Sequence, residues 1–89
     1  MLYLLQEVGY TNLKILDLSY NLIFWIGLHA FSGVNQLTNL DLSNNRLRYI
    51  SSDLFWDTPQ LEILDLSSNV FEKLKNEPFL MHTKLQVIR

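Results

Sequence analysis

The sequence predicts an α/β solenoid in which short parallel strands, one from each repeat, stack side by side into a sheet. The first observation is an eleven-residue frame, Leu-x-x-Leu-x-Leu-x-x-Asn-x-(Leu/Ile/Phe), which begins at Leu13, Leu37 and Leu61 and again, cut short, at Leu85. The second is that successive copies begin 24 residues apart, without an insertion. The third is that apolar and polar residues alternate within each copy. A period held this strictly indicates a repeat array, in which each unit packs on its neighbours.

The alternation in residues 39–43 is typical of a strand with one wet face, with Leu40 and Leu42 pointing inward. Stacked copies then place leucines in continuous inner columns, where burial of each side chain stabilises the fold by roughly 1.5–3 kcal/mol. One column is expected to contain Leu16, Leu40, Leu64 and Ile88, and the other Leu18, Leu42 and Leu66. In this frame Arg89 follows Asp65 in the outward column and ends its run of aspartates.

Residues 13–89 resemble the leucine-rich repeat family through the recurring Leu, Asn and Phe positions. The resemblance implies a leucine-rich repeat solenoid, a right-handed horseshoe segment with a short-stranded, parallel, concave sheet and an irregular or short-helical convex side. The 24-residue unit with one Phe is similar to the typical extracellular subclass. The Leu-Asp-Leu-Ser-x-Asn motif is similar to that of Toll-like receptor ectodomains.

Two further columns are interpreted as structural. An amide side chain offers both a donor and an acceptor to the backbone of a turn, and the resemblance implies that the repeated Asn residues form a ladder between neighbouring turns. The Phe residues are expected to form a buried spine between the sheet and the convex side. The ladder comprises Asn21, Asn45 and Asn69, and the spine comprises Phe31, Phe55 and Phe79. Trp25 and Trp56 do not align, so each is interpreted either as local packing or as an exposed contact, and Trp56 is expected to lie partly exposed on the convex side.

The repeat frame divides the chain into one solenoid segment, residues 1–89. Residues 1–12 form a partial or atypical repeat, residues 13–36, 37–60 and 61–84 form full repeats, and residues 85–89 form a truncated one. Extracellular family members usually close their ends with disulfide-bonded flanks, but this sequence has no cysteine. We expect a fragment of a longer receptor-like protein. The alternative is a complete small protein that self-associates through uncapped ends.

Composition argues against several classes of function. The net charge of −2 without a basic stripe disfavours nucleic acid binding, and no apolar stretch approaches the ~20 residues of a membrane span, so no membrane contact is expected within this segment. The histidines, His29 and His82, are out of repeat register, and the glycines form no phosphate-binding loop. We therefore predict no enzyme activity, no cofactor and no metal site. The sequence shows neither a signal peptide nor an Asn-x-Ser/Thr sequon.

The outward strand positions are the candidate partner-binding surface. Asp17, Asp41 and Asp65 share one column, with a serine two residues after each. The column is interpreted either as a structural feature of the frame or as an acidic stripe that faces a partner, because a flat column offers too few oxygens for calcium. The remaining outward positions vary between repeats, as a recognition surface does. The candidate residues are Ile15, Asp17, Tyr20, Leu22, Asn39, Asp41, Arg46, Ile63, Asp65 and Val70.

The resemblance implies a non-enzymatic protein–protein recognition module in a receptor-like or secreted protein. Its partner would be a protein ligand or co-receptor in innate immune or developmental signalling, and its location extracellular or at the cell surface. Two alternatives remain open, an extracellular matrix or adhesion repeat protein and an intracellular scaffold subunit.

Overall fold

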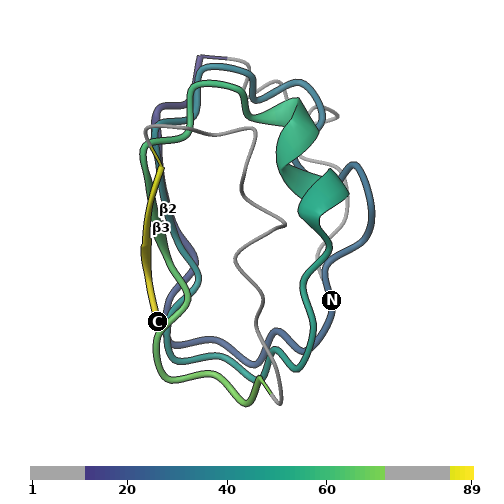
Figure 1. The fold of residues 1–89 in the computed structure, drawn as a ribbon, viewed down its shortest axis with the longest axis vertical. Helices are drawn as coiled ribbons and strands as arrows, with labels where there is room; N and C mark the ends of the chain where they lie inside the picture. Colours follow the sequence, from purple (N-terminus) through teal and green to yellow (C-terminus); the bar gives the residue numbers. More distant parts are fainter. Residues whose placement is uncertain (1–11, 72–84) are drawn as a thin grey trace.

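In the computed structural model the chain winds through successive similar turns, each placing a strand on one wall and a looser segment on the opposite wall (Figure 1). The structure describes residues 12–71 and 85–89. Its strands form one parallel sheet in the order β1-β2-β3-β4. The elements are β1 (Ile15–Asp17), β2 (Asn39–Asp41), the 3₁₀-helix η2 (Ser52–Asp57), β3 (Ile63–Asp65) and β4 (Gln86–Ile88).

The first three strands pair in the register that the repeat frame predicts. Leu40 pairs with Leu16 on one side and with Leu64 on the other. The ladder continues past the strand ends, where Leu18 N donates to Asp41 O at 2.8 Å. The predicted solenoid with a short-stranded parallel sheet is confirmed.

The predicted register of the fourth strand is wrong by one residue. Val87, not Ile88, pairs with Leu64, and Ile88 pairs with Asp65. The backbone hydrogen bond from Leu66 N to Ile88 O, at 2.7 Å, agrees with this pairing. A slip of one residue sends every side chain to the opposite face of a sheet. Val87 therefore packs against the core, and Ile88, not Arg89, ends the aspartate column.

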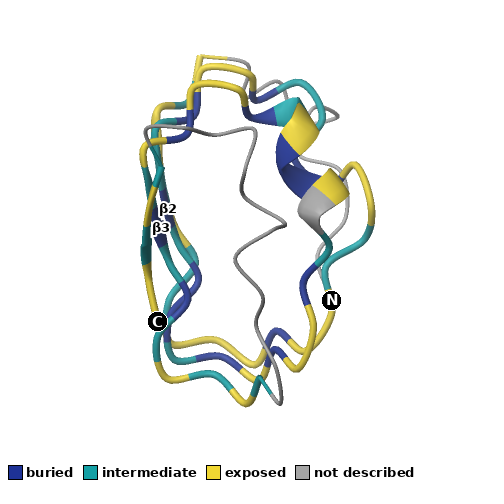
Figure 2. Ribbon diagram, viewed as in Figure 1, coloured by how far each residue is buried: buried dark blue, intermediate teal, exposed yellow. Residues whose placement is uncertain are grey.

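The core lies between the two walls, and buried residues occur on both of them (Figure 2). Leu40 and Leu64 from the sheet and Phe31 and Phe55 from the opposite wall are all fully buried members of one cluster. Leu13, Leu16 and Leu18 of the first repeat are partly buried against the same cluster. Phe79 lies outside the described residues.

The return segments of the first two full repeats contain an equivalent backbone hydrogen bond, although only the second segment forms a helix. Val34 N donates to Phe31 O, and Thr58 N donates to Phe55 O, both at 3.2 Å. Thr58 is buried, and its hydroxyl also donates to Phe55 O, at 3.3 Å. A threonine is therefore accommodated where the first repeat has a valine, because its hydroxyl has a hydrogen-bond acceptor. The helix η2 is capped by Ser51, whose side chain accepts from Asp53 N.

Asparagine side chains connect the turns that follow the strands. Asn45 Oδ1 accepts from Ile23 N and Asn69 Oδ1 accepts from Leu47 N, both at 3.0 Å, so each reaches back into the preceding repeat. The amide nitrogen of each donates to carbonyl oxygens of its own repeat and of the preceding one. Asn21 makes the two local bonds of the same set.

A residue with left-handed backbone precedes each of these asparagines. Tyr20 and Asn44 both have φ of 56°, and Ser68 has φ of 55°. For residues with a Cβ this conformation costs roughly 1–2 kcal/mol, and asparagine tolerates it best. The turn is therefore maintained by the stacked strands and the asparagine ladder rather than by a glycine at this position.

Candidate functional site

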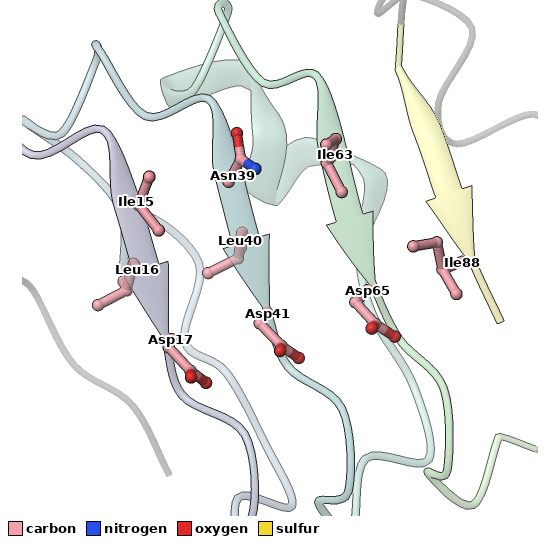
Figure 3. A pocket seen from close by; sticks show the side chains of 9 residues that line it. All are labelled: Ile15, Leu16, Asp17, Asn39, Leu40, Asp41, Ile63, Asp65 and Ile88. Atoms are coloured by element: carbon pink, nitrogen blue, oxygen red, sulfur yellow. The ribbon is translucent and has the colours of Figure 1, made fainter.

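The outer face of the sheet carries a shallow open groove of about 240 Å³ (Figure 3). Two rows of side chains cross the strands along it. The first row is apolar except at its centre and contains Ile15, Asn39 and Ile63, and the carboxylate row contains Asp17, Asp41 and Asp65. Leu16 and Leu40 line the groove between the rows, and Ile88 of β4 stands beside Asp65. The structure thus brings six of the ten candidate residues together on this face.

Each aspartate of the carboxylate row is held by the serine two residues after it. Asp41 Oδ1 accepts from Ser43 N at 2.9 Å and from the Ser43 hydroxyl at 2.6 Å. The same two bonds occur at Asp17 and at Asp65. All of these bonds are accepted by Oδ1, which fixes the orientation of each carboxylate. Among the described residues no donor is bonded to Oδ2, so this oxygen can accept from a partner.

These hydrogen bonds also stabilise the ionised form of the first aspartate. The Ser19 hydroxyl and then the Ser19 N–H hold the pKa of Asp17 below its ordinary value, and both effects outweigh desolvation. The charge at this end of the row is therefore present throughout the neutral range.

Four of the candidate residues lie beyond the strand ends and do not line the groove. Leu22, Arg46 and Val70 occupy one repeat position and are all exposed. The backbones of Arg46 and Val70 are bonded to the preceding repeat, since Arg46 N donates to Ile23 O and Val70 N donates to Leu47 O. Tyr20 is 80% exposed in its left-handed turn. These side chains border the sheet at the ends of the strands, where they can add to the surface that a partner on the sheet would contact.

A second exposed apolar region lies on the return segments, and only Trp25 of it was considered in the sequence analysis, as a single residue. Trp25, Leu28 and Tyr49 are exposed and line a small hollow of about 190 Å³ together with Ile26 and Leu54. Two large apolar residues, Trp25 and Tyr49, at equivalent positions in successive repeats were the available signal. The expected partial exposure of Trp56 is confirmed, because this residue of η2 is 64% exposed.

His29 does not line the groove on the sheet face. His29 Nδ1 lies 3.2 Å from Asp57 Oδ2, a contact that links the return segments of two repeats. His82 lies outside the described residues. Within residues 12–71 and 85–89, no group of three or more His, Asp or Glu side chains is arranged to hold a metal ion. In the same residues no helix has the length and apolar character of a membrane span.

Comparison with known proteins identifies the family of the chain. A search of curated proteins finds no match. The crystal structure of the leucine-rich repeat domain of APL1B is similar to this chain, with a TM-score of 0.70 and 31% identity over 79% of it. The chain spans about a fifth of that structure's length, since it covers 21% of it. The family model described as leucine rich repeat matches residues 11–71. The chain belongs to the leucine-rich repeat family.

Proposed function

We propose that the outer face of the sheet binds a protein ligand or co-receptor. The fold supports this role, because leucine-rich repeat domains are typically non-enzymatic modules that bind protein partners. The observation that carries the proposal is the exposure of large apolar side chains around the groove, with Ile15 67% and Ile88 40% exposed. Apolar side chains grouped beside charged ones on a solvent-exposed face are typical of a protein-interaction surface.

The module is part of a longer receptor-like or secreted protein in this proposal. The 24-residue unit and its Leu-Asp-Leu-Ser-x-Asn motif support a Toll-like context, with innate immune or developmental signalling as the role and the cell surface or extracellular space as the location. The chain's share of the APL1B structure, 21% of its length, supports a larger array of repeats. An epitope-tagged full-length protein should therefore be cleaved by protease added to intact cells. Protection from the protease would contradict the location.

Binding is tested with the 89-residue chain fused to a multivalent reporter and screened against a panel of secreted and cell-surface proteins. For each protein bound, the affinity is measured again with Ile15→Ser and Ile63→Ser combined. We expect at least a ~30-fold loss, since central residues of an interface each contribute about 2 kcal/mol or more.

The matched control is Tyr49→Ser, which changes an exposed apolar residue away from the sheet. It should leave the affinity unchanged, and circular dichroism should show the same fold in every variant. A partner whose binding depends on Tyr49 but not on the two isoleucines would refute the proposed face.

A further inference from the structure

The two rows of the groove carry different chemistry along parallel lines. Ile15 and Asp17 lie at the two ends of β1, and Ile63 and Asp65 lie at the two ends of β3 (Figure 3). Residues two apart on a strand are separated by roughly 6.6 Å, and adjacent strands lie about 4.8 Å apart. The groove therefore runs across the strands, with an apolar side and an acidic side.

The acidic side favours a cationic occupant. Asp17, Asp41 and Asp65 are in direct register on adjacent strands, and like charges placed opposite one another destabilise a sheet. A basic group between them gains their attraction and also relieves their mutual repulsion. The serine bonds to Oδ1 hold the carboxylates in place before binding, so little side-chain entropy is lost when a donor arrives.

The form of the groove favours a chain segment over a small molecule. The groove is open along the sheet face, whereas small-molecule sites enclose most of the surface of their ligand. An extended polypeptide directs successive side chains to opposite sides. If such a segment lies along the groove, one set of alternate side chains meets the isoleucines and the other set meets the aspartates.

We propose that the groove binds an extended segment of the partner protein in which basic residues alternate with apolar residues. This inference rests on the proposed function of the sheet face and specifies the partner's chemistry. The row of Asp17, Asp41 and Asp65 spans roughly 10 Å, so it faces two alternate basic side chains of the segment, while the apolar side chains contact Ile15 and Ile63. Asn39, between the two isoleucines, offers a donor and an acceptor to the backbone of the segment.

The test uses the whole 89-residue chain and fluorescein-labelled peptides in an anisotropy titration. The probe is Arg-Leu-Arg-Leu-Arg-Leu-Gly. One control, Arg-Arg-Arg-Leu-Leu-Leu-Gly, has the same composition in blocks, and a second, Glu-Leu-Glu-Leu-Glu-Leu-Gly, reverses the charge. We expect the alternating basic peptide to bind about tenfold more tightly than either control, and its affinity to fall as salt is raised because the pairs are partly exposed.

Matched protein variants assign the effect to the carboxylate row. Asp41→Asn with Asp65→Asn keeps an acceptor for each serine but removes two charges. It should weaken binding of the alternating peptide by roughly two- to thirtyfold, since each exposed ion pair contributes little. Asp53→Asn with Glu62→Gln removes the same charge at residues that do not line the groove, and should leave affinity unchanged.

The inference is overturned if the block peptide binds as tightly as the alternating one, if both pairs of substitutions weaken binding equally, or if the alternating peptide does not bind at 1 mM. Its failure is distinct from failure of the proposed function. A partner protein that still requires Ile15 and Ile63 would leave the sheet face as the binding surface with a different partner chemistry. A partner that ignores both isoleucines would instead remove the proposed function itself.

Discussion

Replacement of Asn45 by alanine tests how the asparagine ladder stabilises the stack. Asn45 is 7% exposed, and its Oδ1 is the acceptor for the N–H of Ile23, a residue that is itself 8% exposed. Its Nδ2 donates to three carbonyl oxygens, those of Leu18, Leu42 and Ser43. The substitution therefore removes one acceptor and one donor group from a buried turn.

The cost falls mainly on the Ile23 N–H. Each of the three carbonyl oxygens retains another donor after the substitution; these donors are Asn21 Nδ2, Asn69 Nδ2 and Tyr20 N. An unsatisfied buried donor costs about 1–3 kcal/mol, and each lost hydrogen bond contributes less. We expect the free energy of unfolding to fall by about 2–3 kcal/mol, which in a domain of this size lowers Tm by roughly 10–20 °C.

Asn21→Ala is the matched control, because Asn21 is exposed and its two bonds, to Leu18 O and Ser19 O, stay within its own repeat. Its substitution should cost less than about 1 kcal/mol. Thermal and urea unfolding followed by circular dichroism measure both variants. Equal losses in the two, or a loss below about 0.5 kcal/mol for Asn45→Ala, would refute the argument that the contact between repeats matters more than the local turn.

Three further predictions concern the core, the strained turns and the acidic row. Phe55→Ala should lower the free energy of unfolding by about 3–5 kcal/mol, whereas Trp56→Ala, at the exposed neighbouring residue, should cost less than about 1 kcal/mol in the same urea titration; a similar cost for both would contradict the buried spine. Asn44→Val should cost about 1–2 kcal/mol because a β-branched residue is disfavoured at positive φ, while Asn39→Val in β2 should cost little, and an equal effect in thermal unfolding would contradict the strained turn. Ser19→Ala should raise the pKa of Asp17, as measured by NMR titration of the carboxyl carbon. Because this pKa is lowered in the folded chain, the Asp17 carboxylate stabilises the fold at pH values above its unfolded pKa, and this stabilisation is lost as the pH falls through the folded pKa. An unchanged pKa in the variant would show that the Ser19 hydroxyl is not the main cause of the lowered value.

Most of the architecture follows from the spacing of the repeats. The recurrence of Leu16 at Leu40 and Leu64 was sufficient to predict parallel pairing in register, because equivalent residues of stacked units are adjacent in space. The sheet-face candidates followed from the alternation, which separates Asp41 from Leu40 and Leu42. The aromatic region around Trp25 and Tyr49 was not predicted, because their 24-residue spacing indicates equivalent positions but not whether those positions are buried or exposed on the return segments.

The fourth strand shows where the repeat frame was insufficient. Residues 85–88, Leu-Gln-Val-Ile, fit the frame with Ile88 inward and fit simple alternation with Val87 inward. Both choices bury one β-branched residue, so local pattern does not separate them. In the folded chain Val87 packs against the core opposite Leu64, while Ile88 joins the outer face beside Asp65. The chemistry at that end of the groove therefore changes from the predicted arginine to an isoleucine.

The sequence by itself determined the solenoid, its parallel sheet and the two rows of outward residues, because a fixed period combined with alternation places each side chain relative to the next unit. Only the tertiary structure decided the register of β4 and the left-handed turns at Tyr20, Asn44 and Ser68. Each of these depends on contacts with a neighbouring repeat or on backbone geometry that stacking imposes. Such contacts are set by the packing of whole units, which the pattern within a single unit does not specify.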